Sequence, residues 1–390
     1  MIQILDKSTC CGCTVCSSIC PKGCISMIED GEGFKYPSVN PDKCINCGLC
    51  EKACPMLHPK TENHVIKVFS AKNKDESIRK DSSSGGVFSQ LASLVLNEGG
   101  IVVGCKLDKA LQAVHSIATN EEELKSFRSS KYVQSDLEGV YQQIRGLLNE
   151  GRTVLFSGTP CQVAGLRRFL RKDYEQLFCI DVLCHGVPSP RLYKDYLLTQ
   201  QQRFSSEPVS VNFRNKQKGW KRLFIEIRFA NGRRYFKFSG FDPYMSLFLN
   251  NKSQRSSCFH CPFTTVNRPG DISLGDFWGI GKKYPDYDDD KGISMILINT
   301  NKGLELFNRI IAGFNVFESN VELAIAGNKV LEKPISGETL RDEFYGDYCK
   351  YGFHSATEKH AAIPPVLVQH YYTLMRWGLD LVRKVRHRGY

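Results

Sequence analysis

The cysteine runs CCGCTVCSSICP at residues 10–21 and CINCGLCEKACP at residues 44–55 share one spacing, with gaps of two, two and three residues before a final Cys-Pro. This spacing is typical of bacterial proteins that hold iron–sulfur clusters: three cysteines of a run wrap one cluster, and the fourth binds the neighbouring cluster. The predicted ligand sets are Cys10, Cys13, Cys16 and Cys54 for one 4Fe–4S cluster, and Cys44, Cys47, Cys50 and Cys20 for the other. The pattern indicates electron transfer.

Two other interpretations of these cysteines explain less. A structural zinc site needs only four thiolates in two pairs and leaves the third cysteine and the Cys-Pro end of each run unexplained. A secreted disulfide framework fits poorly, because the chain is long, its cysteines are bunched and its first residues show no apolar signal core. No run of about 18 apolar residues occurs that could span a membrane. We therefore expect a reducing, cytoplasmic compartment.

Length and charge set broad limits. The 390 residues suggest about two to three domains, and 42% hydrophobic residues are enough for substantial cores. The formal net charge is +11, yet the first 60 residues carry six Lys or Arg and six Asp or Glu. The excess therefore lies beyond residue 60, where it favours an anionic partner such as a phosphorylated cofactor, an acidic protein or a lipid surface.

The apolar pattern divides the chain into three regions. Residues 1–60 are predicted to form an α+β ferredoxin-like cluster module, with a short strand pair between the cysteine runs. Residues 67–300 alternate strands and helices as in an α/β domain with a mostly parallel sheet, and residues 301–390 are predicted to be a mostly helical C-terminal tail. The expected order in the middle region is strand 101–107, helix 136–149, strand 153–156, helix 161–171, strand 177–183, helix 190–203, a hairpin of 222–229 with 233–239, and strand 293–298.

A further group of cysteines lies in the middle region. Cys161 and Cys184 each follow a predicted strand, so a right-handed crossover would bring both to the carboxyl edge of the sheet, where ligands bind. Cys258 and Cys261 come from a later loop and would complete a set of four. A third iron–sulfur cluster, a zinc site and unconnected thiols all fit this spacing. His185, beside Cys184, is a candidate proton carrier.

The loop from Ser82 to Gly86 is a candidate phosphate cradle. Its small residues would let backbone N–H groups approach an anion, and the helix that follows would add the positive end of its dipole. An ordinary serine cap explains the same residues.

Basic residues gather in two places beyond the module. On the hairpin they are interpreted as a solvated face or as a collector of an anionic small-molecule substrate, and nucleic-acid binding is not expected. These residues are Arg214, Lys216, Lys218, Lys221, Arg222, Arg233 and Arg234. The basic tail at residues 366–388 either docks on the body or makes peripheral contact with a membrane.

Six motifs in this order resemble the family of coenzyme F420 hydrogenase/dehydrogenase beta subunits up to about residue 300, and a two-cluster ferredoxin module is common in its bacterial members. The resemblance implies FAD in the α/β domain, with Ser83, Ser84, Gly85 and Gly86 at its phosphates and Lys131 and Tyr132 nearby. It also implies an inner cluster on Cys161, Cys184, Cys258 and Cys261. The motifs are SSSGGVFSQLA (82–92), SSKYVQSD (129–136), FSGTPCQVAGL (156–166), DVLCHGVPSP (181–190), CFHCPF (258–263) and GDISLGDFWGI (270–280).

Together these features predict an iron–sulfur flavoprotein oxidoreductase. Electrons would pass between the 4Fe–4S clusters, FAD and an organic substrate or deazaflavin-type carrier, since a flavin converts single electrons into pairs. His185 and Lys131 are the candidate catalytic residues, and a redox partner protein or ferredoxin is the expected partner. The alternative is an electron-transfer adapter that docks on a partner enzyme and has no organic substrate of its own, because no G-x-G-x-x-G nicotinamide fingerprint follows a strand.

Overall fold

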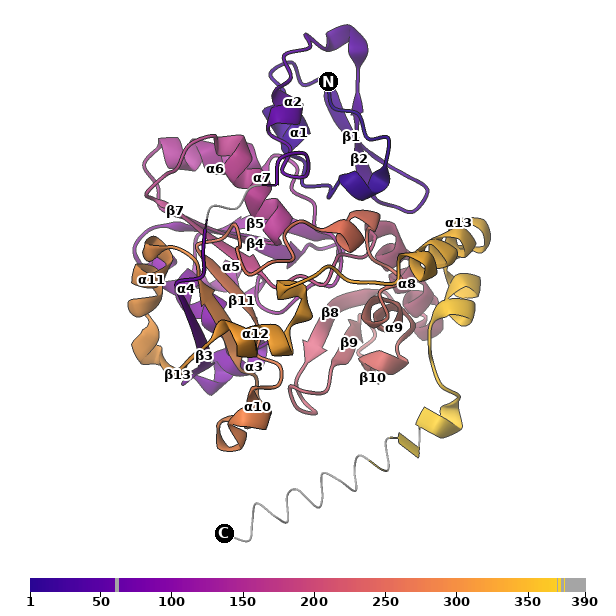
Figure 1. Ribbon diagram of the computed structural model, residues 1–390. Coiled ribbons are helices and arrows are strands. Elements are labelled where there is room, and N and C mark those ends of the chain that lie inside the picture. Colours follow the sequence, from indigo (N-terminus) through magenta and orange to yellow (C-terminus); the bar gives the residue numbers. More distant parts are fainter. Residues whose placement is uncertain (60–62, 370, 373–374, 376–390) are drawn as a thin grey trace.

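The computed structural model describes residues 1–59, 63–369, 371, 372 and 375. Its N-terminal part projects from one end of the molecule (Figure 1). There β1 (Ile25–Glu29) pairs antiparallel with β2 (Lys35–Val39), and the short helices α1 (Val15–Ile19) and α2 (Leu49–Lys52) each lie within a cysteine run. The predicted strand pair between the runs is present.

The body is built on a sheet of eight strands in the order β13-β3-β12-β11-β7-β6-β4-β5. Its strands are β3 (Lys67–Asn73), β4 (Ile101–Leu107), β5 (Ala113–Ala118), β6 (Val154–Gly158), β7 (Leu177–Val182), β11 (Ile272–Asp276), β12 (Ser294–Ile298) and β13 (Phe314–Ser319). The four central strands β4, β6, β7 and β11 run parallel. The alternating pattern predicts the first three, whereas β11 is absent from the expected order. The outer strands pair antiparallel, so the sheet is mixed rather than parallel throughout.

Both faces of this sheet are buried, which explains the nearly continuous apolar runs of its central strands. Along β4, Val102 packs with one core while Ile101 and Val103 pack with another, as expected from the two-residue period of a strand. Helices α4 (Val87–Asn97), α5 (Glu121–Lys125) and α11 (Asn301–Asn308) contribute to the first core, and α6 (Val140–Asn149) and α7 (Pro160–Leu170) to the second.

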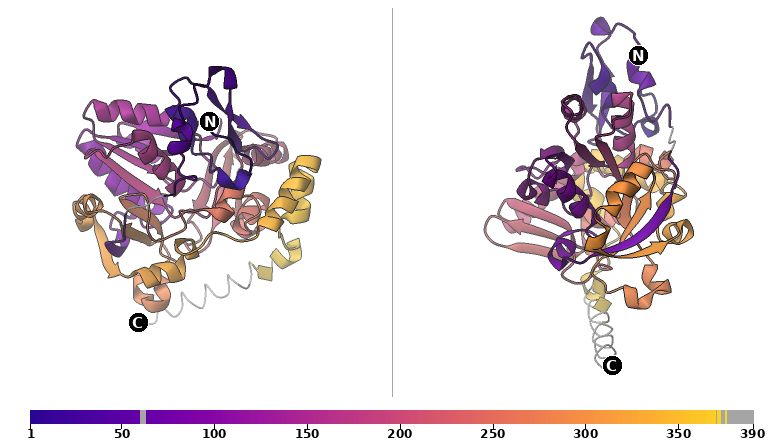
Figure 2. Two further views of the ribbon diagram at one scale, coloured as in Figure 1. Left: turned by 45° about the horizontal axis from the view of Figure 1, so that its top comes forward. Right: turned by 90° about the vertical axis from the view of Figure 1, so that its left-hand side faces the viewer.

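A smaller antiparallel sheet of order β10-β9-β8 lies beside the main one (Figures 1 and 2). It consists of β8 (Pro208–Asn215), β9 (Phe224–Phe229) and β10 (Arg234–Phe238). The predicted hairpin is therefore present, and β8 is an additional strand. An aromatic core joins this sheet to α8 (Pro190–Phe204), α9 (Pro243–Leu249) and α13 (Glu338–His360).

The region after residue 300 is mostly helical among the described residues, but it contains one strand that was not predicted. Its strand β13 pairs with β3, so the main sheet continues past the expected boundary at 300. Alternating polar and apolar residues in the sequence FNVFES suit an edge strand, which the sequence reasoning overlooked. Other helices are α3 (Glu76–Asp81), α10 (Ile280–Lys283) and α12 (Val321–Gly327). Among the described residues, none of the helices is both long enough and apolar enough to cross a membrane.

Candidate functional site

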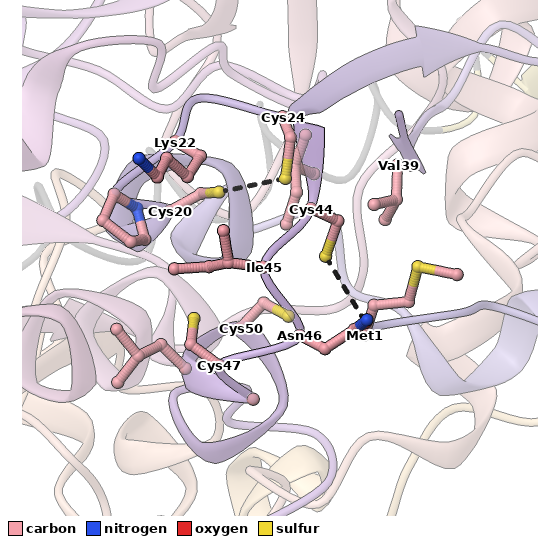
Figure 3. A pocket seen from close by; sticks show the side chains of 14 residues that line it. Met1, Cys20, Lys22, Cys24, Val39, Cys44, Ile45, Asn46, Cys47 and Cys50 are labelled. Carbon is pink, nitrogen blue, oxygen red and sulfur yellow. Dashed lines mark hydrogen bonds between the residues drawn. The ribbon is translucent and has the colours of Figure 1, made fainter. Parts of the chain in front are cut away.

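The second predicted ligand set surrounds a single cavity in the N-terminal module. Cys44, Cys47 and Cys50 from the second run and Cys20 from the first run all line it (Figure 3). The fourth cysteine of the first run, Cys20, therefore lies beside three cysteines of the second run that follow it by more than twenty residues. Cys47 is exposed, so this cavity lies at the surface of the module. Cys24, outside the predicted sets, lies with its sulfur 3.3 Å from that of Cys20.

The first predicted set lies deeper, towards the body. Burial, together with the negative charges of Cys10 and Cys54, raises the pKa of the Cys16 thiol to about 12. The negative charge of Cys10 also contributes to the raised pKa of Cys54, and that of Cys16 contributes to the raised pKa of Cys13. The structure therefore brings all four cysteines of this set together, including Cys54 from the second run.

The four cysteines of the middle region also gather at the carboxyl edge of the main sheet. Cys161 lies in the first turn of α7 after β6, Cys184 follows the neighbouring parallel strand β7, and Cys258 lies in a 3₁₀ helix of residues Ser256–His260. Burial raises the pKa values of Cys184 and Cys261 to about 12, with Cys161 adding to both shifts. Burial and mutual repulsion disfavour the thiolate form of all four cysteines, so four thiolates at this site need positive charge to balance them. Within the described residues, no three His, Cys, Asp or Glu side chains converge as ligands of a single metal ion.

A cavity of about 490 Å³ adjoins this inner set. The wall includes the start of α4, the segment 127–133, the ends of β6, β7 and β11, and Arg214 of β8. Cys184 belongs both to the inner set and to this wall, and its neighbour His185 also lines the cavity. The volume is in the range of cofactor and substrate sites, and its position matches the ligand edge of an open α/β sheet.

One end of the cavity suits an anion. Helix α4 begins at Gly86, whose φ of +86° favours glycine, and no side chain caps the N–H groups of its first turn. Arg128 lines the same cavity, and its buried Nε has no hydrogen-bond partner among the described residues. An unpartnered guanidinium nitrogen beside an uncapped helix N-terminus is a fitting place for phosphate oxygens. Arg128 was not among the residues singled out from the sequence.

The predicted cradle residues divide into two groups. Gly85 is required by packing, since a Cβ there would lie 2.1 Å from the Ala71 carbonyl oxygen. Its N–H donates to Ser294 Oγ at 2.9 Å and therefore does not face a ligand. Ser83, Ser84 and Gly86 line the cavity, with Ser83 Oγ accepting from the Ser130 N–H at 2.7 Å.

Lys131 lines the cavity, and its ammonium is held by the backbone of its own segment. Its ammonium donates to the carbonyl oxygens of Ser126, Arg128 and Ser129 at 2.8–3.0 Å, which uses all three of its donors. Burial lowers the pKa of Lys131 to about 8. The residue therefore shapes the cavity wall, and its bonding leaves no donor for catalysis.

Of the two interpretations of the basic hairpin, the solvated face is wrong for its first two members, and Arg214 lines the cavity. Arg214 is buried and pairs with Asp276 at 2.8 Å, while its other contacts include Tyr132 Oη at 3.0 Å. Lys216 donates to backbone carbonyls of the 79–84 segment and of Lys291, and burial followed by repulsion from Arg79 lowers its pKa to about 7. Arg214 in β8 and Lys216, directly after it, tie this strand to the segments around the cavity, because both side chains turn inward.

A histidine missed by sequence reasoning completes the cavity. His115 on β5 is buried, its Nε2 lies 3.0 Å from the Ser157 carbonyl oxygen and its Nδ1 lies 3.0 Å from Ser135 Oγ. Burial lowers the pKa of His115 to about 4, so its ring is neutral at pH 7. Burial also lowers the pKa of His185. A prediction of β5, which sequence reasoning omitted, would have placed His115 at the sheet edge.

Comparisons with protein families match three parts of the chain. Residues 9–57 match a 4Fe–4S dicluster domain. Residues 68–142 match the N-terminal part, and residues 151–321 the C-terminal part, of the coenzyme F420 hydrogenase/dehydrogenase beta subunit.

Several relatives agree with these matches. The F(420)H(2) dehydrogenase of Methanosarcina mazei contains a subunit that is 24% identical over 345 residues, which cover 79% of this chain and 90% of the relative. The coenzyme F420-dependent sulfite reductase of Methanocaldococcus jannaschii is 25% identical over 203 residues, covering 50% of this chain and 31% of that protein. A solved structure of the F420-reducing [NiFe] hydrogenase complex of Methanosarcina barkeri aligns with 74% of this chain and 90% of its own at 19% identity, with a TM-score of 0.46. The chain belongs to the family of coenzyme F420 hydrogenase/dehydrogenase beta subunits and carries a 4Fe–4S dicluster domain ahead of the family's two parts.

Proposed function

We propose that this chain is an iron–sulfur flavoprotein oxidoreductase in which electrons pass between a two-cluster module, an inner cluster and FAD. The observation that carries the proposal is the double position of Cys184, which belongs to the inner cysteine set and to the wall of the 490 Å³ cavity. A group held by the inner set would border directly on a ligand in the cavity. Electron transfer between two cofactors requires such a short distance between the group on the inner set and the ligand in the cavity.

The cysteine sets support three 4Fe–4S clusters. The twelve proposed ligands are Cys10, Cys13, Cys16, Cys54, Cys20, Cys44, Cys47, Cys50, Cys161, Cys184, Cys258 and Cys261. All are free cysteines, and each set of four gathers in one place from segments apart in sequence. Thiolate is the ligand of such clusters.

The cavity residues support FAD. Arg128 and the first turn of α4 would hold the pyrophosphate, and the aromatic rings of Tyr132 and Trp278 would supply apolar walls. A bound flavin would supply the exchange between one-electron and two-electron chemistry. His185 stays a candidate for proton transfer because it lies in the same wall.

The substrate is proposed to be a deazaflavin-type carrier or another organic anion. Two relatives carry coenzyme F420 in their names, and the basic composition beyond residue 60 favours an anionic partner. A redox partner protein would dock on the module near Cys47, where Met1 and Ile45 are also exposed. A cytoplasmic location remains our expectation. The basic residues of the tail proposed for membrane contact lie outside the described residues; they are Arg376, Arg383, Lys384, Arg386 and Arg388.

Anaerobic purification with cofactor analysis tests the proposal. We expect about twelve iron and twelve acid-labile sulfide per chain, together with one FAD. Reduction of the flavin by a deazaflavin, a nicotinamide or a viologen dye then separates the two functions considered. Turnover with the dye alone would favour the adapter, and the absence of flavin would overturn the flavoprotein assignment.

A further inference from the structure

The N-terminal module is fixed to the body by several buried or half-buried cations. Lys35 of the module pairs with Asp136 of the body at 2.6 Å, and Arg341 of α13 pairs with Glu32. A third cation, Arg255, lies on the body three residues before Cys258 and reaches into the module. Of these contacts, the one made by Arg255 includes a cysteine of the first ligand set.

Arg255 is completely buried, and its guanidinium spans the junction. Nε donates to the Cys10 carbonyl oxygen at 2.7 Å, one terminal nitrogen donates to the Lys35 carbonyl oxygen at 2.9 Å, and the other lies 3.1 Å from Gln134 Oε1. The nitrogen that donates to Lys35 also lies 3.6 Å from the Cys10 sulfur. The guanidinium further covers the ring of Tyr36, 4.1 Å from its centroid.

The hydrogen-bond partners of Arg255 among the described residues are carbonyl oxygens, the Gln134 side chain and a cysteine sulfur, and no carboxylate is among them. A buried cation without a counter-charge is costly. Arg255 contacts both cysteine sets: its guanidinium lies against the Cys10 sulfur of the first set, and its carbonyl oxygen accepts from the Cys258 N–H of the inner set at 2.9 Å. Negative charge on a cluster held by Cys10 would therefore balance this cation.

Helix α7 brings the same two sites close together. Cys161 of the inner set lies in its first turn, and Gly165 follows one turn later. A Cβ on Gly165 would lie 3.3 Å from the Cys13 sulfur, so the glycine makes room for the first set. Cys11, which belongs to neither set, interacts with both Cys13 and Cys161.

We propose that Arg255 is a positioning residue for electron transfer: it orients the Cys10 side of the first cluster against the inner set and raises the reduction potential of that cluster. This inference rests on the proposed iron–sulfur function. The transfer moves one electron, so one site is oxidised as the other is reduced, and no bond or proton changes place. A cation and an N–H donor at a ligand sulfur stabilise the more negative, reduced state, which raises the potential.

The test is an anaerobic redox titration followed by electron paramagnetic resonance. In Arg255→Gln we expect the potential of one ferredoxin-type cluster to become more negative, while the cluster on Cys20, Cys44, Cys47 and Cys50 keeps its potential. Arg255→Lys retains the charge but not the planar fork, so its shift should be smaller and in the same direction. Magnetic coupling between the first and the inner cluster should weaken in Arg255→Gln.

Arg341→Gln is the matched control, because Arg341 is equally buried at the junction and pairs with Glu32 without touching a cysteine. It should leave both potentials unchanged. An equal shift in Arg341→Gln, or unchanged potentials in Arg255→Gln with full iron, overturns the inference. If Arg255→Gln does not fold, Arg255→Lys decides, and a parental potential there overturns it. A parent protein without iron would instead overturn the proposed function itself.

Discussion

The N-terminal module and the body hold their cysteines in opposite ways. In the module, three of the four ligands in each set lie within seven consecutive residues, and only Cys20 and Cys54 are exchanged. In the body, the inner set extends from Cys161 to Cys261 and depends on the parallel pairing of β6 with β7. The positions of most cysteines in the module are thus determined by their spacing in the sequence. The positions of the inner cysteines are determined by the fold of the whole sheet.

The largest expected effect tests this contrast at the inner site. Replacing Cys184 and Cys258 together by Ser removes two of four thiolates, so we expect the loss of four of about twelve iron atoms. The clusters of the module should remain, because none of their ligands comes from the body. Iron and sulfide analysis measures the loss, with Cys349→Ser as the control at an exposed cysteine outside the three sets. Unchanged iron in the double variant would remove the inner cluster from the proposal.

The second effect concerns the cations that were predicted to collect substrate. Arg214→Met removes the cation that pairs with the largely buried Asp276 and leaves that carboxylate the hydrogen bond from Trp220 Nε1, which should cost about 3–5 kcal/mol of unfolding free energy. The exposed Arg233 on the same small sheet is the control, and Arg233→Met should change stability by about 0.5 kcal/mol or less. Anaerobic urea unfolding compares the two variants. Equal stability of both would restore the solvated hairpin interpretation.

The third effect tests the anion end of the cavity. Arg128→Gln should weaken flavin retention by on the order of 10- to 100-fold, because a charged hydrogen bond to phosphate contributes about 1.5–3 kcal/mol. Stability should change little, since the Arg128 Nε has no partner to lose in the described residues. Flavin fluorescence after dialysis measures retention, and Arg152→Gln, on the exposed far end of the β6 strand, is the control. Full flavin occupancy in Arg128→Gln would mean that the phosphates of the flavin are bound at another part of the cavity.

The sequence predicted the strands β4, β6, β7 and β12 and the crossover helices, because the alternating apolar pattern determines these, but it did not predict the central strand β11. The sequence could not show that the two adjacent glycines have different roles. Gly85 allows close packing against β3 and β12, whereas Gly86 begins helix α4 at the cavity. Nor could the sequence show that Arg214 turns inward, since that depends on β8, which was not predicted. Edge strands β5 and β13 pair antiparallel outside the alternating pattern, and His115 was missed with β5.

The smallest effect concerns Lys131 and depends on pH. Burial lowers its pKa from 10.5 to about 8 in the folded chain, so the folded state releases the proton first as pH rises. Between about pH 8 and 10.5 the unfolded state binds more protons, and stability therefore increases with pH. The carbonyl oxygens of Ser126, Arg128 and Ser129 oppose the effect by favouring the ammonium, so we expect a gain on the order of 1 kcal/mol.

Urea midpoints at pH 7.5 and 9.5, compared between the parent and Lys131→Met, isolate this contribution from other titrating groups. Cys105 is the titratable neighbour that faces Lys131, and it is present in both proteins. The parent should gain more stability than the variant over this interval. An equal gain in the parent and in Lys131→Met would mean that Lys131 keeps its charge throughout this interval, because the three carbonyl oxygens that accept from its ammonium outweigh the cost of burial.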